Sequence, residues 1–523
     1  MSTSEHTNRN IGKVYLVGAG PGDPGLLTLR GKYLLERAEV VVYDYLANKK
    51  LLKHVAPGAE MIYVGKKGGG LHAFTQEGIN DLLVEKGLAG KMVVRLKGGD
   101  PFIFGRGAEE IEELVGAGIP FEVVPGVTSA TAAATYAGIP ITHRKFTASV
   151  AFITGHEDPT KKESNIRWDK LATGAGTIVI FMGIKNLPVI TGKLMEHGRD
   201  PKTPVAVVRW ASTPEQQSVE GTLETITEVV REAGIKPPAL IVVGEVVSLR
   251  KTIDWYEKRP LFGKHIVVTR TREQASELVA MLEEDGADCL EYSTINIEPV
   301  EDYSVLDLEL AAIGSCDWLL FTSLNAVTYF FRRLQERGLD SRSLAGPKIA
   351  VVGRATGEEL RKYGISVDLV PEKFTGEGLA EALVGEGMTG KKVLLPRALV
   401  ARDVLPQTLQ KAGAEVIVAP VYRNVAPEGR KDQLRQELED KKIDMVTFTS
   451  SSTVTNFLTM VDAASPEELQ QLMVGVDIAA IGPITSKTVE DSGLQVTVQP
   501  ERYTIPDMVN AIVDHYRKHR NTA

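Results

Sequence analysis

Short apolar runs alternate with amphipathic stretches along the whole chain. The runs are rich in Val and Ile, as buried strands are, and the stretches between them carry apolar residues at helical spacing. This alternation predicts an α/β protein with largely parallel sheets. The clearest runs are KVYLVGAG (13–20), AEVVVYD (38–44), MVVRLKGGD (92–100), HIVVTR (265–270), DWLLFTS (317–323) and KIAVVG (348–353).

One stretch breaks both periodicities and is expected to separate two domains. It is DWYEKRPLFGK (254–264), which is charged and contains Pro260 and Gly263. Such a composition is typical of a connection between domains. We therefore expect a disordered leader (1–11), a first domain (12–255), a linker (256–263), a second domain (264–518) and a tail (519–523).

The second half contains an internal repeat. VVTRT matches LLPRA, DWLLFTSLNAVTYF matches DMVTFTSSSTVTNF, and IAVVGRATGEEL matches IAAIGPITSKTV. A period this long indicates a duplicated domain rather than a solenoid unit, so we expect two α/β lobes with a cleft between them. The matched residues are Arg270 with Arg397, Ser323 with Ser450, and Thr356 with Thr485, which lie 127, 127 and 129 positions apart.

Composition and charge limit the class of protein. The 523 residues carry a formal net charge of −8 and are 43% hydrophobic, which is ordinary for a soluble globular protein. No apolar run approaches the ~18 residues of a membrane span, and the negative charge argues against bulk nucleic-acid binding. Cys289 and Cys316 have no metal-ligand spacing and make no disulfide framework. We expect a cytoplasmic protein with no metal and with neither a nucleic-acid nor a membrane partner.

A glycine-rich loop follows the first apolar run, where a dinucleotide-binding loop would stand. Its sequence is VGAGPGD (17–23), whereas the dinucleotide fingerprint is G-x-G-x-x-G. Asp23 replaces the third glycine and would bring a carboxylate close to the phosphates. Pro21 has no backbone N–H to donate to a pyrophosphate. Asp44 lies about 20 residues further on, as a ribose-binding acid would, and this spacing keeps a dehydrogenase as an alternative.

Polar residues follow several other expected strands, where open α/β sheets place their sites. RLKGGDPFIFGRGAEE (95–110) ends a strand in a Gly-Gly-Asp-Pro turn. VPGVTSATAAATYAGIPITHR (124–144) places Thr128 and Ser129 after a second glycine turn, and Asp44 ends another strand. Motifs of serine hydrolases, zinc proteases and P-loop proteins do not occur. The candidate chemistry therefore lies in turns at strand ends.

Together these segments resemble the tetrapyrrole methylase family. VGAGPGDPGLLTLRG, VVVYD, VGKKGG, VVRLKGGDPFIFGRGAEE, VPGVTSA, AGIPITHR, FMG and PPALIVVGEVV occur in the family's order over roughly residues 12–255. The resemblance implies a two-lobed methylase fold with S-adenosylmethionine (SAM) between the lobes, so the glycine loop lines a methylase site. It assigns SAM contacts to Pro21, Gly98, Gly99, Asp100, Ile103, Thr128, Ser129, Met182 and Ala211.

The same resemblance implies roles, a substrate and an oligomeric state. Asp44 is implied as the proton acceptor and Lys66 as the proton donor. The implied reaction is the double methylation of uroporphyrinogen III to precorrin-2, for sirohaem or cobalamin. That substrate carries eight carboxylates, for which Arg106, Arg144 and Lys145 are candidate partners. A homodimer through this half is also implied.

Residues 264–518 resemble the uroporphyrinogen-III synthase family. The matching segments are VVTRTREQ, FTSLNAV, VGRAT, LLPRALVARDVLPQTLQKAGAEV, VYRN, FTSSSTV and IGPITSKT. The resemblance implies a two-lobed, internally duplicated parallel α/β fold that cyclises hydroxymethylbilane between its lobes. Because the family builds one lobe from the first segment plus the last third, lobes and repeats need not coincide. Tyr422 is the candidate acid, and the other polar cleft positions are Thr356, Ser450 and Thr485.

The combined hypothesis is a bifunctional enzyme whose second half makes uroporphyrinogen III and whose first half methylates it. Two alternatives stay open. The second half can instead be a noncatalytic module that binds tetrapyrrole for the methylase, with Tyr422 packed at the cleft edge. The first half can be an NAD-dependent dehydrogenase, against which Pro21 and Asp23 argue.

Overall fold

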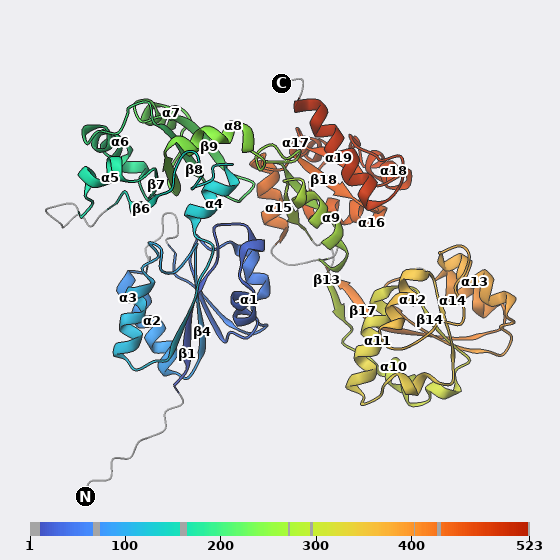
Figure 1. The fold of residues 1–523 in the computed structure, drawn as a ribbon. Coiled ribbons are helices and arrows are strands. Elements are labelled where there is room, and N and C mark those ends of the chain that lie inside the picture. Colours follow the sequence, from blue (N-terminus) through green and yellow to red (C-terminus); the bar gives the residue numbers. More distant parts are fainter. Residues whose placement is uncertain are drawn as a thin grey trace, which may run out of the picture. The chain divides into compact units, whose positions relative to one another are not determined.

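A computed structural model describes residues 11–65, 74–156, 165–269, 272–292, 296–401, 403–425 and 430–520 (Figure 1). The chain divides into two compact units. The first unit comprises Met1–Lys264, Leu282–Asp288 and Tyr516–Ala523, and the second comprises His265–Met281 and Cys289–His515. The expected leader (1–11) lies almost wholly outside the described residues.

The first unit begins with a parallel sheet of order β3-β2-β4-β1-β5. Separate apolar cores form on its two faces, one with α1 and the other with α2 and α3. Figure 1 shows α1 on one side of this sheet and α2 and α3 on the other. In a parallel sheet all strands end at one edge, so the polar turns after these strands share that edge. The elements are β1 (Lys13–Gly18), α1 (Leu29–Leu35), β2 (Val40–Tyr43), β3 (Glu60–Tyr63), α2 (Gln76–Leu88), β4 (Met92–Lys97), α3 (Gly107–Gly116) and β5 (Phe121–Val124).

The second sheet of this unit, of order β6-β7-β10-β8-β9, is mixed. Here β6 and β7 pair in parallel, whereas β7–β10, β10–β8 and β8–β9 pair antiparallel, so the expectation of largely parallel sheets is wrong for this sheet. A short turn rather than a helix joins β8 to β9, and such a connection returns the chain antiparallel. The elements are α4 (Ser129–Tyr136), β6 (Val150–Thr154), α5 (Trp168–Gly174), β7 (Thr177–Phe181), α6 (Leu187–Glu196), β8 (Pro204–Arg209), β9 (Gln217–Thr222), α7 (Ile226–Glu232), β10 (Ala239–Val243) and α8 (Arg250–Ile253).

The second unit contains two sheets, of order β12-β11-β18-β19 and β13-β17-β16-β14-β15. In the second of these, β14, β15, β16 and β17 pair in parallel and β13 adds an antiparallel edge. The strands are β11 (His265–Val268), β12 (Asp288–Glu291), β13 (Asn296–Pro299), β14 (Trp318–Phe321), β15 (Lys348–Val351), β16 (Lys392–Ala398), β17 (Glu415–Val425), β18 (Met445–Phe448) and β19 (Asp477–Ala480).

Helices cover these sheets. One apolar core joins α10, α11 and α12 to one face of the β14 sheet, and another joins α13 and α14 to its opposite face. The helices are α9 (Arg272–Glu284), α10 (Ser304–Ala311), α11 (Leu324–Glu336), α12 (Arg354–Arg361), α13 (Gly376–Gly385), α14 (Val404–Lys411), α15 (Arg430–Glu439), α16 (Ser451–Val461), α17 (Pro466–Leu472), α18 (Pro483–Asp491) and α19 (Ile505–Arg520).

The duplication is real, but the two repeats exchange strands. The repeat pairs β11 with β16, β14 with β18 and β15 with β19 in sequence. In space β11 joins β18 and β19, while β16 joins β14 and β15. Each sheet therefore combines the first strands of one repeat with the later strands of the other, as the family resemblance implies.

The described part of the chain lacks two kinds of feature. None of its helices is long and apolar enough to cross a bilayer. Its His, Cys, Asp and Glu side chains form no cluster of three or more that could hold a metal ion.

Candidate functional site

The glycine loop after β1 and the turn after β4 are bonded to each other at the sheet edge. The amide of Gly99 donates to the carbonyl of Gly20 over 2.7 Å, and the Gly20 amide donates back over 3.3 Å. Gly99 has a φ of 67°, which favours glycine. Pro21 follows this bridge, so the loop is held by backbone contacts on one side and can present its other side to a ligand.

Asp100 joins the β4 turn to the turn after β5. Its Oδ1 accepts the Phe102 amide over 2.8 Å, and its Oδ2 accepts the Gly126 amide over 3.0 Å. A Cβ added to Gly99 would lie 3.6 Å from the Ser129 amide nitrogen, so the start of α4 adjoins the same turn. Asp100 thus holds together the turns that carry most of the expected SAM contacts.

The start of α4 offers polar groups to this region. Thr128 is buried, yet its side chain makes no capping bond to α4. The first amides of a helix and an uncommitted hydroxyl suit a polar or anionic ligand group. The glycine turns leave the backbone accessible beside them, so the residues present fit SAM.

The second sheet of this unit contributes the other side of the region. A Cβ added to Gly22 would lie 2.6 Å from Cγ2 of Thr213 and 3.2 Å from the carbonyl oxygen of Ala211, so the glycine loop abuts the turn after β8. Ile103 packs against the core that contains Ala211 and Phe181. Met182 follows with a φ of 54° and a half-exposed side chain. The structure thus brings the nine expected SAM contacts to one region.

Both carboxylate oxygens of Asp23 accept hydrogen bonds within the first unit. Its Oδ1 accepts the Gly25 amide at 2.7 Å, and its Oδ2 accepts the Tyr136 hydroxyl at 2.8 Å. Its own amide donates to Oγ of Ser212 over 3.1 Å. The carboxylate is therefore a latch that fixes the glycine loop.

The aromatic ring of Tyr136 also contacts the segment 254–264, which was expected to separate the two domains. It lies 5.4 Å from the ring of Trp255 and 4.7 Å from that of Tyr256, between centroids. Glu257 accepts bonds from Gln216 and Ser218 in the same unit. Part of the segment expected to be a linker therefore packs on the first unit.

Removing the Tyr136 hydroxyl tests the latch. Tyr136→Phe is expected to cost about 1.5 kcal/mol of stability, because it deletes a hydrogen bond to a carboxylate. Burial, and then the bond to Asp23, raise the pKa of Tyr136, so the bond persists while the phenol is protonated. The stability difference from the wild type should stay constant up to about pH 10, the ordinary pKa of tyrosine. It should shrink above that pH, because the unfolded wild type then ionises its phenol while the folded phenol stays protonated.

Urea unfolding of the first unit between pH 7 and pH 11 measures this difference. Tyr33→Phe is the matched control, since Tyr33 is 46% exposed. Equal stability of Tyr136→Phe and wild type at neutral pH contradicts the latch.

Asp44 directly follows β2 at the same sheet edge as the glycine turns. Its Oδ1 accepts the Leu46 amide over 3.0 Å, and its Oδ2 accepts Nη2 of Arg95 over 3.0 Å. A Cβ added to Gly98 would lie 2.5 Å from that of Leu46, so the Asp44 turn touches the β4 turn. Lys66, the implied proton donor, lies outside the described residues.

A buried group of charges stands behind Asp44, and the sequence reasoning missed it. Arg95, Lys97 and Glu110 have side chains that are 6% exposed or less. Nζ of Lys97 lies 2.5 Å from Oε1 of Glu110, and Nε of Arg95 lies 3.4 Å from the same oxygen. Burial, and then the charge of Arg95, lower the pKa of Lys97. A signal was available in the sequence: Arg95 and Lys97 lie two residues apart in an otherwise apolar strand, so both side chains point to the same face of the sheet.

The three expected substrate-binding cations are exposed. Arg106 has a φ of 57° and pairs with Glu109 over 2.5 Å. Arg144 and Lys145 follow α4 on the surface, and the Lys145 amide donates to Nδ1 of His143 over 3.2 Å. The structure shows no contact among these three cations. That all three bind substrate carboxylates therefore stays a prediction.

In the second unit, Tyr422 is a buried residue of β17. Its hydroxyl lies 3.2 Å from Oγ of Ser323, which caps α11 by accepting the Ala326 amide. Its ring centroid lies 5.8 Å from that of Tyr329. Thr356, buried in the first turn of α12, belongs to the same lobe.

Ser450 and Thr485 belong to the other lobe of this unit. Ser450 caps α16, forms a reciprocal capping box with Thr453 and lies 2.9 Å from Ser452 between hydroxyl oxygens. Thr485 is buried in the first turn of α18, which packs against α16. The four expected synthase residues thus divide equally between the two lobes.

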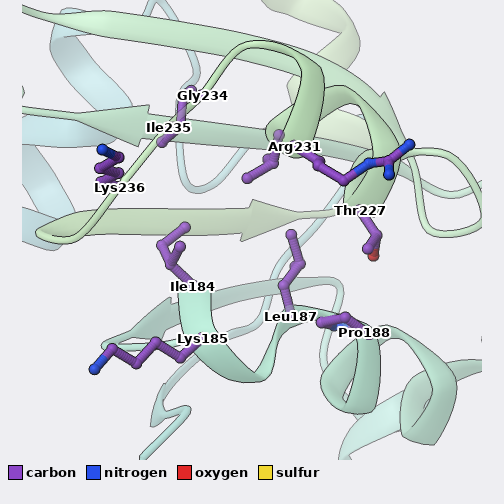
Figure 2. Close-up of a pocket in the computed structure, with 10 residues that line it drawn as sticks. Ile184, Lys185, Leu187, Pro188, Thr227, Arg231, Gly234, Ile235 and Lys236 are labelled. Carbon is purple, nitrogen blue, oxygen red and sulfur yellow. The ribbon is translucent and has the colours of Figure 1, made fainter.

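A pocket of about 320 Å³ lies apart from these residues, between α6 and α7 of the first unit. Figure 2 shows Ile184 and Leu187 pointing into it from below Ile235, with Lys185 and Lys236 at one end. None of the expected site residues lines it.

Comparison with known proteins identifies both halves. The family described as "Tetrapyrrole (Corrin/Porphyrin) Methylases" matches residues 13–227, and the family described as "Uroporphyrinogen-III synthase HemD" matches residues 276–510. Both resemblances are thereby confirmed, and the dehydrogenase alternative is wrong.

Individual relatives agree with these matches. The porphyrin biosynthesis protein HemD of Ruminiclostridium josui is 39% identical over 503 residues, 96% of this chain and 98% of its own. An S-adenosyl-L-methionine-dependent uroporphyrinogen III methyltransferase of Methanosarcina barkeri is 55% identical over 46% of this chain and 94% of its own.

Among solved structures, uroporphyrin-III C-methyl transferase of Thermus thermophilus complexed with S-adenyl homocysteine is 43% identical. It covers 46% of this chain and 100% of its own, with a TM-score of 0.39. Because the R. josui relative aligns along nearly the whole length of both chains, the chain belongs to the porphyrin-biosynthesis proteins in which a tetrapyrrole methylase precedes a uroporphyrinogen-III synthase.

Proposed function

We propose that the second unit cyclises hydroxymethylbilane to uroporphyrinogen III and that the first unit methylates this product twice with SAM, giving precorrin-2. The observation that carries the proposal is the meeting of the glycine loop, the Asp100-bound turns and Asp44 at one sheet edge. The names of the methyltransferase relatives support SAM as the methyl donor. Relatives named siroheme synthase support sirohaem as one destination of the product. We propose cobalamin as another.

In methyl transfer, SAM supplies an electrophilic methyl group on a sulfonium. A pyrrole carbon forms the new C–C bond, the S–C bond breaks and its electron pair stays on sulfur. The ring then carries an extra positive charge and must lose one proton. Asp44 accepts that proton in our proposal, while the Asp100-bound turns hold the donor in line. Arg106, Arg144 and Lys145 bind substrate carboxylates.

In the synthase reaction, hydroxymethylbilane loses a hydroxyl before the ring closes with its last pyrrole inverted. The leaving oxygen needs a proton, and Tyr422 supplies it in our proposal. The Ser323 hydroxyl beside it supports this role, since it can donate to the phenol oxygen and leave the phenol proton to face the substrate. Thr356, Ser450 and Thr485 bind the folded chain from the two lobes.

We also propose that the domains span 12–255 and 264–518, that the protein is cytoplasmic, and that it forms a homodimer through the methylase half. Product analysis tests the central claim. The protein is given hydroxymethylbilane with and without SAM, and uroporphyrinogen isomers and precorrin-2 are separated by chromatography. Uroporphyrinogen III without SAM and precorrin-2 with SAM are expected. Type I isomer alone, which forms without a synthase, would leave the second unit as the noncatalytic module.

Tyr422→Phe tests the synthase acid. The change removes one hydroxyl and keeps the ring that packs against Tyr329, so we expect kcat to fall about 10-fold with little change in melting temperature. The ratio of type III to type I product should fall with it. Tyr303→Phe is the control. Tyr303 directly precedes α10 in the same lobe, and the variant likewise removes one tyrosine hydroxyl, which donates to the Val421 carbonyl. Wild-type rate and isomer ratio in Tyr422→Phe contradict the assignment.

A further inference from the structure

The carboxylate of Asp44 is held on both oxygens and still has room for a substrate. The Leu46 amide and the Arg95 guanidinium each occupy one oxygen. A carboxylate has about four acceptor positions, so one on each oxygen is left by these two bonds. The Asp44 side chain is 20% exposed, and the side chain of its partner Arg95 is 4% exposed. The acceptor therefore faces outward from a buried cationic support.

Arg95 is itself fixed at every nitrogen position. Nη1 donates to the Leu96 carbonyl over 3.0 Å, Nη2 to Asp44 over 3.0 Å, and Nε lies 3.4 Å from Glu110. A planar guanidinium anchored at three points cannot rotate without breaking all of these contacts. Asp44, on a short turn after β2, thus receives its orientation from the central strand β4.

The charges of this group balance but do not favour stability. Two cations, Arg95 and Lys97, stand beside two anions, Asp44 and Glu110. Oε2 of Glu110 is buried without a hydrogen-bond partner among the described residues. Well-packed apolar side chains are often as stable as such a buried cluster, so its stability contribution alone does not explain it.

We propose that Arg95 is the positioning residue of the methyl-transfer site, and that it fixes the Asp44 carboxylate against the pyrrole while Glu110, itself held by Lys97, fixes Arg95. This inference rests on the proposed role of Asp44 as proton acceptor. Arg95 does not touch the substrate; it acts through Asp44.

The test combines Arg95→Gln, Arg95→Lys, Asp44→Asn and the double variant Asp44→Asn/Arg95→Gln in the full chain. Methyl transfer to uroporphyrinogen III gives kcat and KM, calorimetry gives the Kd for SAM, and hydroxymethylbilane cyclisation in the same samples reports folding of the other unit. Arg30→Gln is the matched control, since it breaks an exposed pair with Glu122 of 2.8 Å in the same unit.

Arg95→Gln is expected to lower kcat about 10-fold, with Kd for SAM within about twofold of wild type. Arg95→Lys keeps the charge but not the three-point anchorage, so it should recover only part of that loss, and it remains informative if Arg95→Gln does not fold. In the Asp44→Asn background, Arg95→Gln should change kcat by less than about twofold, because the two residues act as one.

Three results overturn the inference. The first is a wild-type kcat in folded Arg95→Gln. The second is a double variant whose fold-loss in kcat equals the product of the two single losses, because the two residues would then act independently. The third is a wild-type kcat in Asp44→Asn. Asp44 would then not be the proton acceptor and Arg95 would have no acceptor to position, although the protein would still be a methylase. The proposed function fails separately, if the wild-type protein forms no methylated product.

Discussion

Replacing Asp100 with alanine is expected to raise the Kd for SAM about 100-fold while hydroxymethylbilane cyclisation keeps its wild-type rate. The carboxylate accepts two backbone amides, from Phe102 and Gly126, and so ties the β4 turn to the β5 turn. A hydrogen bond to a charged group contributes about 1.5–3 kcal/mol, so loss of both can account for the ~2.7 kcal/mol that a 100-fold change requires. The synthase is spared because it belongs to the other unit.

Calorimetric titration of SAM measures this effect. Asp200→Ala is the matched control, since Asp200 is an exposed acid that likewise accepts an amide two residues on, from Lys202 over 2.9 Å. The control should lose that turn contact and keep SAM affinity. Asp100→Asn should fall between the two, because the amide retains one acceptor oxygen. Unchanged SAM affinity in Asp100→Ala would show that Asp100 has no part in holding SAM.

The sheet architecture of the second unit was largely predictable from sequence. Apolar strand runs and the offset between Ser323 and Ser450 indicate duplicated α/β lobes, and the structure has them. The mixed sheet of the first unit was not, because strand direction depends on whether a helix or a turn joins the strands. The stretch between Arg209 and Gln217 carries no signal that distinguishes the two clearly.

The site was predictable where backbone chemistry decides it. Gly99 and Asp100 stand in a Gly-Gly-Asp-Pro turn at the end of a strand. The structure gives Gly99 a positive φ and Asp100 a bond from the Gly126 amide, while their contacts with SAM stay a prediction. The partner of Asp23 could not be predicted, because Tyr136 lies 113 positions away in the sequence. Arg95 and Glu110 were missed for a related reason: a charge within an apolar run shows no partner until α3 packs on the sheet.

Replacing Asp44 with asparagine is expected to lower the kcat of methyl transfer about 100-fold and to leave the Kd for SAM within about twofold of wild type. The substitution keeps the size of the side chain and an oxygen that can accept the Leu46 amide. It removes the negative charge that offsets the methylated ring, and an amide cannot take up the proton that the ring must lose. The amide nitrogen would also face Arg95 if the oxygen pointed to Leu46, so no orientation satisfies both neighbours.

Two further variants separate charge from position. Asp44→Glu keeps the carboxylate but moves it by one methylene, so its kcat should lie between those of wild type and Asp44→Asn. Asp81→Asn removes an exposed acid of α2 in the same unit and should leave kcat unchanged. Single-turnover transfer from prebound SAM measures the step itself and avoids product release. A rate for Asp44→Asn within about twofold of wild type would make the carboxylate a structural partner of Arg95 and would require another residue at this sheet edge to accept the proton.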